Sequence, residues 1–295
     1  MHVAKVDFIG IGAQKAATTW LHHVLSGHHS ILTSETKELN FFTANYDRGY
    51  TWYESCFEAS TDSAIRGECS PTYFFSRDAA ERAARYSPEL KLICILRDPI
   101  DRAFSNHMHE IRKGHIPPET TFEDAWKDNP AYSLQSQYKA NLRRWLANFD
   151  RDALLLLFSE DIASNPNAIY EQVCGHLGVA PEQRPASITE RHHENITYTY
   201  PAVQKTLRYV GDAMRSLGMQ ELVKNLKQAP GVKQALSMNK QHLKTMVTPP
   251  TQETREMLID HFQSDIEYVA QITGRAVLPW PTWPELHSDD TAANE

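Results

Sequence analysis

The sequence is poor in cysteine and has no long apolar run. Its 295 residues include four cysteines, none in a Cys-x-x-Cys pair or at a spacing typical of a zinc site. The apolar stretch near the N-terminus is short and is interrupted by Lys5 and Asp7, and no later run reaches the roughly 18 apolar residues of a membrane span. We therefore expect a cytoplasmic protein with no metal, no membrane span and no signal peptide, whose Cys94 and Cys174 are core thiols.

The chain also lacks an excess of positive charge. It carries 30 Lys and Arg against 37 Asp and Glu, a formal net charge of −7. This balance disfavours broad binding to nucleic acid and weighs against a long polyanionic acceptor, although it permits a small basic pocket. The sequence gives no indication of the oligomeric state.

Apolar side chains make up 41% of the chain, which is enough for a substantial core. We predict one domain over residues 1–283. Basic residues scattered through 182–250 favour either a helical lid over an anionic ligand or a solvated helical surface. Residues 284–295 are acidic and rich in small side chains, so we expect a disordered tail.

Short apolar segments alternate with helical patterns along the chain. The predicted strands are residues 6–12, 64–68, 90–96 and 154–158. Such alternation predicts an α/β fold in which a central parallel sheet is covered by helices on both faces. The arrangement is that of a three-layer, P-loop-NTPase-like protein.

One segment, residues 8–21, combines a strand, a loop of small residues and the start of a helix. The loop carries Lys15, and Thr18 and Thr19 follow it. Backbone N–H groups, the positive end of the helix dipole and the lysine can converge there on a phosphate-like anion. A magnesium-dependent P-loop enzyme needs Ser or Thr directly after the lysine, but Ala16 stands in that position.

A second strand-to-helix segment, residues 92–105, carries Arg97 at the strand end and Ser105 eight residues later. A guanidinium and a hydroxyl placed in this way suit a second phosphate. Asp98 and Asp101 are better explained as helix-start residues than as catalytic carboxylates.

At these residues the chain resembles sulfotransferases that use 3′-phosphoadenosine-5′-phosphosulfate (PAPS). Lys15, Thr18 and Thr19 match the family loop that holds the 5′-phosphosulfate, while Arg97 and Ser105 match its 3′-phosphate pair. The resemblance continues in residues 37–42, 68–74 and 158–161. It is closest to the heparan-sulfate-type enzymes and to bacterial sulfotransferases acting on carbohydrates or small molecules.

The resemblance implies a PAPS site and no obligatory metal. The residues implied in donor binding are Lys15, Ala16, Ala17, Thr18, Thr19, Trp20, Arg97 and Ser105. Lys15 would also stabilise the leaving oxygen. Many relatives carry Gly where Ala16 or Ala17 stands here, so a positive φ angle at either position would cost about 1 kcal/mol.

The resemblance also points to candidate bases. Glu38 is the first choice, because the family's catalytic glutamate lies in a matching Glu-x-x-Phe-Phe segment after a second strand at the same sheet edge. Otherwise Glu38 is a surface carboxylate paired with Lys37. Glu68 is the runner-up base. His109 lies at the offset of a histidine that assists catalysis in some relatives, or is a surface helix histidine.

The leading hypothesis is sulfuryl transfer to a hydroxyl, rather than an amine, of a carbohydrate, lipid-linked or small organic acceptor. A magnesium-dependent nucleotide kinase of related fold and a non-catalytic nucleotide-binding protein remain as alternatives. The aromatic residues in 46–53 either stack on the acceptor or pack beneath a loop. The acceptor itself does not follow from the sequence.

Overall fold

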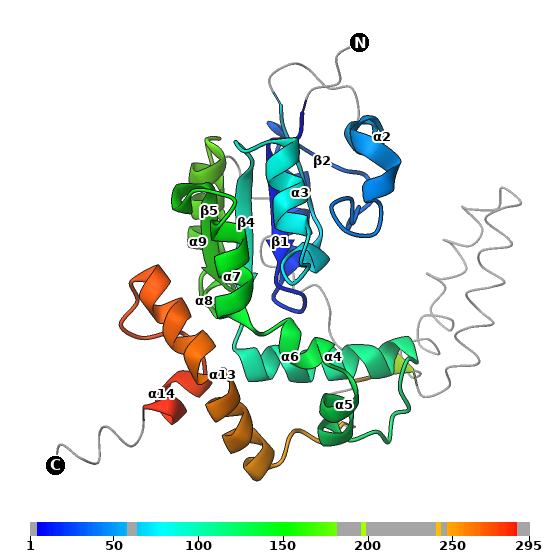
Figure 1. Cartoon of the computed structure of the whole chain (residues 1–295), viewed down its shortest axis with the longest axis vertical. Coiled ribbons are helices and arrows are strands. Elements are labelled where there is room, and N and C mark those ends of the chain that lie inside the picture. Colours follow the sequence, from blue (N-terminus) through cyan, green and yellow to red (C-terminus); the bar gives the residue numbers. More distant parts are fainter. Residues whose placement is uncertain (1–4, 58–63, 182–195, 199–239, 243–246, 288–295) are drawn as a thin grey trace, which may run out of the picture.

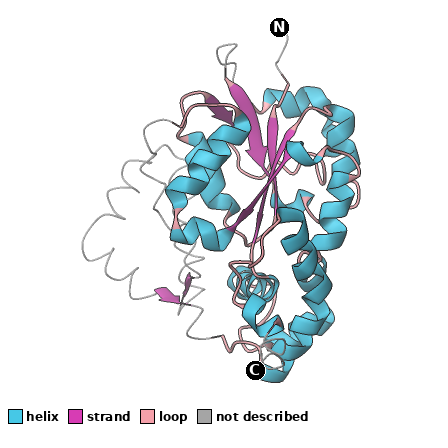
Figure 2. Cartoon of the chain, turned by 90° about the vertical axis from the view of Figure 1, so that its left-hand side faces the viewer, coloured by secondary structure: helices cyan, strands magenta, loops and turns pink. Residues whose placement is uncertain are grey.

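A computed structural model describes residues 5–57, 64–181, 196–198, 240–242 and 247–287. Five parallel strands form a sheet of order β2-β3-β1-β4-β5. They are β1 (Phe8–Gly12), β2 (Ile31–Thr33), β3 (Ile65–Cys69), β4 (Lys91–Leu96) and β5 (Leu154–Phe158). Figure 2 shows this sheet in magenta, between helices on both sides.

Helices cover the two faces of the sheet. The described helices are α1 (Thr18–Ser26), α2 (Gly49–Ser55), α3 (Ala79–Tyr86), α4 (Pro99–Lys113), α5 (Phe122–Asp128), α6 (Ala131–Leu134), α7 (Tyr138–Leu146), α8 (Ser159–Ser164), α9 (Pro166–Leu177), α13 (Gln252–Thr273) and α14 (Thr282–Leu286). Helix α1 packs on β1, β2 and β3, and α9 packs on β4 and β5. Helices α3 and α7 contact each other and lie in front of the sheet in Figure 1. The predicted three-layer α/β fold is confirmed.

The strands are apolar because the sheet is buried on both faces. All five residues of β1 are buried, as are the last five of β4. The four predicted strands are present, with ends shifted by at most two residues. The hydrophobic pattern did not predict β2, which is three residues long and too short to give a pattern of its own, and only the resemblance implied a strand before Glu38.

Helix α4 begins and ends with strong local signals. The Asp98 carboxylate accepts hydrogen bonds from the N–H groups of Ile100, at 3.0 Å, and Asp101, at 3.1 Å. Pro99 occupies the first helical position, and Gly114, with a φ of 74°, ends the helix. Asp98 is thus a helix-start residue, as predicted.

The predicted apolar stripes lie in the core. Trp145 of α7 and Phe262 of α13 are buried, and so are Cys94 and Cys174. The cysteines carry free thiols. No helix in the described ranges is long and apolar enough to cross a membrane.

The structure describes only part of two segments predicted near the C-terminus. Within 182–250, where a helical lid or a helical surface is predicted, residues Ile196–Tyr198 (β6) and Lys240–His242 (β7) pair as antiparallel strands. Residues 182–195, 199–239 and 243–246 lie outside the described residues, so the prediction for them stays a prediction. The expected tail starts in a helix, because α14 continues to Leu286. There Glu285 accepts a 2.7 Å hydrogen bond from Arg255 of α13, and this contact holds the segment. Residues 288–295 lie outside the described part.

The carboxyl ends of the parallel strands point toward α4 and α6, which lie across this edge of the sheet (Figure 1). Loops that follow the strands therefore meet there. This edge carries the residues that the sequence singled out.

Candidate functional site

The loop between β1 and α1 has an unusual backbone. Lys15 and Ala17 adopt left-handed conformations, with φ angles of 71° and 65°. Gly12 starts the loop with a φ of 152°, and a Cβ there would lie 2.6 Å from the Cβ of Phe74, so only glycine fits. Ala17 precedes α1, and an alanine has no side-chain atom that could cap this helix. The positive end of α1 can therefore face an external anion.

The other predicted donor residues of this segment are less accessible. Ala16, Thr18 and Trp20 are buried, and Thr19 is half-buried. Their side chains mostly fix the loop against the core. Their backbone N–H groups are the atoms that an anion at the helix start would meet.

We predict that Ala17→Gly stabilises the protein and that Ala16→Gly destabilises it. Ala17 has a left-handed backbone, which costs an L-residue about 1 kcal/mol that glycine avoids. Ala16 is buried and is not among the residues with positive φ, so glycine there loses packing and gains unfolded-state freedom, about 1 kcal/mol. Urea unfolding midpoints measure both effects. Equal losses in the two variants would contradict the left-handed assignment.

Lys15 lies among other cations. Its Nζ is 3.4 Å from Nδ1 of His109 on α4. Burial, together with the charges of Arg112 and Arg97, lowers the pKa of Lys15 to about 8. A dense positive charge that is partly desolvated is a strong attractor for a phosphate or sulfate group.

Arg97 stands directly after β4 and faces the same loop. Its guanidinium donates a hydrogen bond of 3.4 Å to the carbonyl oxygen of Lys15, and it lies 3.6 Å from the carboxylate of Asp101. Ser105 is buried on α4, one turn before His109, and so shares a helix face with the histidine that contacts Lys15. The two predicted anion-binding elements therefore meet at one edge of the sheet.

His109 accepts hydrogen bonds rather than donating them through Nδ1. Arg112, which has only donor atoms, lies 2.8 Å from this nitrogen. Burial and the charge of Lys15 lower the pKa of His109 to about 4, so the ring is neutral near pH 7. This arrangement suits positioning of the Lys15 amine. Arg112 was not among the predicted site residues, although its i+3 spacing from His109 is a signal for a shared helix face.

Glu38 lies in the segment after β2. Its side chain is 44% exposed and forms an ion pair with Lys37. The carboxylate also acts electrostatically on Lys15 and raises the lysine pKa against the larger effects of burial and neighbouring cations. Glu38 is thus both the predicted partner of Lys37 and a neighbour of the loop between β1 and α1 that carries Lys15, called the anion loop below.

Glu68, the runner-up base, lies in the core. It is fully buried near the end of β3, and its two oxygens accept hydrogen bonds from Ser70, at 2.7 Å, and Tyr73, at 2.6 Å. Burial raises its pKa to about 7. The surrounding core covers the Glu68 side chain.

The aromatic residues near 46–53 pack together. The rings of Phe41 and Tyr53 stack at 4.3 Å, and both residues are fully buried. Arg82 lies 4.5 Å above the ring of Tyr46, and Arg48 lies 3.8 Å above the ring of Trp52. These contacts favour the packed cluster over an open stacking surface.

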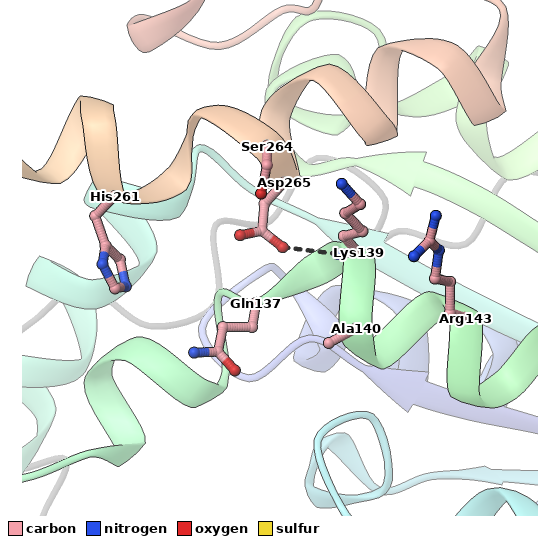
Figure 3. A pocket seen from close by; sticks show the side chains of 7 residues that line it. All are labelled: Gln137, Lys139, Ala140, Arg143, His261, Ser264 and Asp265. Carbon is pink, nitrogen blue, oxygen red and sulfur yellow. Dashed lines mark hydrogen bonds between the residues drawn. The ribbon is translucent and has the colours of Figure 1, made fainter.

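A separate cavity of about 360 Å³ lies between α7 and α13, away from the anion loop. Lys139 and Asp265 both line this cavity. The Asp265 carboxylate accepts a 2.8 Å hydrogen bond from the backbone N–H of Lys139 (Figure 3). It lies apart from Lys15 and Arg97, neither of which lines it. Within the described residues, no cluster of three His, Cys, Asp or Glu side chains could hold a metal ion.

A parallel α/β sheet whose carboxyl edge carries a lysine loop and an arginine defines an anion-binding protein of the P-loop-like class. Comparison with known proteins identifies the family within this class. A family model described as "Sulfotransferase domain" matches residues 5–245. The chain belongs to the sulfotransferase domain family, and the family predicted from the sequence is confirmed.

Similar proteins include two heparan sulfate enzymes. Bifunctional heparan sulfate N-deacetylase/N-sulfotransferase 4 of Mus musculus is 33% identical over 196 residues, which cover 59% of this chain and 22% of that protein. Heparan sulfate glucosamine 3-O-sulfotransferase 3B1 of Homo sapiens is 29% identical over 205 residues, which cover 66% of this chain and 50% of that protein. The chain thus spans between a fifth and a half of the length of these relatives.

A solved structure shares the fold. The crystal structure of a sulfotransferase from Alicyclobacillus acidocaldarius superposes with a TM-score of 0.58 at 23% identity, covering 75% of this chain and 96% of that one. This likeness confirms the predicted P-loop-like α/β architecture.

Proposed function

We propose that this chain is an enzyme that transfers the sulfuryl group of PAPS to a hydroxyl or amine of a carbohydrate or other small organic acceptor. The observation that carries the proposal is the joint position of Lys15 and Arg97. The Arg97 guanidinium donates a hydrogen bond to the carbonyl oxygen of Lys15, so the two residues lie side by side at one edge of the sheet. A single molecule with two separated phosphate groups can reach both.

The residues fit such a donor. The start of α1, where Ala17 offers no capping side chain, and the Lys15 ammonium suit the 5′-phosphosulfate, which carries negative charge and many acceptor oxygens. Arg97 and Ser105 suit the 3′-phosphate. Ala16 stands where a magnesium-binding hydroxyl would be needed, which favours this donor over ATP with magnesium.

The proposed reaction is an in-line displacement at sulfur. The acceptor oxygen or nitrogen forms a bond to sulfur while the bond from sulfur to the bridging oxygen of the 5′-phosphate breaks. Negative charge grows on that oxygen, where the Lys15 ammonium stabilises it. The products are the sulfated acceptor and 3′-phosphoadenosine-5′-phosphate (PAP), and the acceptor proton passes to a base.

Glu38 is the proposed base. Its carboxylate is exposed enough to meet an acceptor and lies close enough to Lys15 to influence it electrostatically. Glu68 is enclosed by the core, and the pKa of His109, near 4, makes this ring a weak base. His109 is instead proposed to hold the Lys15 amine.

A glycan is the proposed acceptor class. The two heparan sulfate relatives support it, as one is named for N-sulfation and the other for 3-O-sulfation. Lys37 and Arg112 add positive charge beside Lys15 and Arg97, which suits an acceptor that carries acidic groups. The position of the sulfate on the product shows whether the acceptor nucleophile is oxygen or nitrogen.

Binding and transfer measurements test this function. We expect calorimetry to show PAP binding in the presence of EDTA, and labelled PAPS to sulfate short glucosamine oligosaccharides under the same conditions. Phosphate transfer from ATP that a chelator abolishes would favour the kinase instead. PAP binding without transfer to any acceptor would favour a non-catalytic nucleotide-binding protein.

A further inference from the structure

A buried carboxylate lies beneath the segment that carries Glu38. Glu68 is 0% exposed, yet it forms no salt bridge within the described residues, and the charge of Lys37 acts on it only from a greater distance. Its partners are two hydroxyl groups, Ser70 Oγ at 2.7 Å and Tyr73 OH at 2.6 Å. A buried carboxylate held in this way costs free energy of folding.

The same two hydroxyl groups also bind the backbone of the segment that carries Glu38. Ser70 Oγ accepts a hydrogen bond of 2.9 Å from the N–H of Asn40, and Tyr73 OH accepts one of 2.8 Å from the N–H of Phe41. Each hydroxyl has a single proton and directs it at Glu68. Their lone pairs are therefore aimed at the two backbone N–H groups, so the carboxylate fixes the direction of both hydroxyls.

The backbone that these bonds hold is strained. Glu38 and Asn40 adopt left-handed conformations with φ angles of 64° and 50°. Such conformations persist only where the surroundings enforce them. Two further bonds do so here: the Asn40 amide donates to the carbonyl oxygen of Glu38 at 2.8 Å, and Thr72 donates to the Asn40 side chain at 2.7 Å.

We propose that Glu68 is a positioning residue that holds the Glu38 carboxylate at the site by orienting Ser70 and Tyr73 against the Asn40–Phe41 backbone. The proposal rests on the proposed function, in which Glu38 is the base. In Glu68→Gln the amide nitrogen can only donate, so one hydroxyl loses its acceptor and turns. The segment then relaxes from its left-handed conformation, and Glu38 is displaced.

The structure offers a matched control for Tyr73. Tyr53 is also fully buried, but its hydroxyl has no hydrogen-bond partner within the described part of the chain. Tyr73→Phe removes a hydroxyl that links Glu68 to the Phe41 N–H, whereas Tyr53→Phe removes one that links nothing. Both replacements keep the ring.

The experiment combines amide hydrogen exchange with kinetics on the full chain. In Glu68→Gln and Tyr73→Phe we expect faster exchange in peptides covering residues 37–43. We also expect kcat for transfer from PAPS to a glucosamine oligosaccharide to fall about 10- to 100-fold, because displacing a reacting group by about an ångström costs this much. PAP affinity should stay within about twofold, since Lys15 and Arg97 lie outside the network. Tyr53→Phe should leave all three readouts unchanged.

Two results would overturn the proposal. One is unchanged exchange over residues 37–43 in both network variants. The other is faster exchange with unchanged kcat, because Glu38 would then not need this position. A wild-type chain that transfers nothing would overturn the proposed function and the catalytic part of this proposal, whereas the exchange result judges the network itself.

Discussion

Lys15→Ala is expected to lower kcat/KM for sulfuryl transfer about a thousandfold. Lys15 is the cation placed where charge grows on the leaving oxygen, and losing one such donor costs about 100- to 1000-fold. Its amine donates to His109, and burial, together with the charges of Arg112 and Arg97, lowers its pKa to about 8. Initial rates with labelled PAPS measure the loss.

A pH profile of PAP binding belongs to the same prediction. Lys15 of the free protein loses its proton as the pH rises through about 8, so binding an anion above that pH requires proton uptake. The wild-type Kd should rise above pH 8, by up to about tenfold per pH unit, while the Kd of Lys15→Ala should stay flat there. Lys127→Ala, which removes an exposed lysine of α5, should behave as the wild type. If Lys15→Ala kept the wild-type rate of transfer, Lys15 would have no part in the mechanism.

Arg97→Ala is expected to weaken PAP binding about a hundredfold. Truncating one member of a partly buried, hydrogen-bonded charge pair costs about 2–5 kcal/mol, and Arg97 is only 26% exposed. In the variant the carboxylate of Asp101, which lies 3.6 Å from the guanidinium in the wild type, has lost this partner and repels the 3′-phosphate, which adds to the loss. Calorimetry with PAP gives the affinity directly.

The ligand itself provides the control for Arg97. Adenosine 5′-phosphate lacks the 3′-phosphate, so the wild type should prefer PAP to it, and Arg97→Ala should remove most of that preference. Arg85→Ala, which removes an exposed arginine paired with Glu81 on α3, should leave the preference intact. If Arg97→Ala lowered the affinities for PAP and adenosine 5′-phosphate equally, Arg97 would not bind the 3′-phosphate.

The sequence was a good guide to the elements that carry local signals. Strands buried on both faces are continuous apolar runs, which is why β1, β4 and β5 were predictable. Asp98 before Pro99 marks a helix start in the sequence itself. Lys15 and Arg97 could be paired as one site because parallel strands end at a common edge. The three-residue strand β2 and the helix α14 carry no such pattern.

Contacts between distant residues were decided only by the tertiary structure. The order β2-β3-β1-β4-β5 places the Lys15 loop beside the element that follows β4, and this brings His109 within 3.4 Å of a residue 94 positions away. The same order puts β2 next to β3, so Glu68 lies under the Asn40–Phe41 backbone. Residue types and spacing determined which groups can bind an anion. Their burial and partners, which separate Glu38 from Glu68, depend on packing that brings together segments with no pattern in common along the chain.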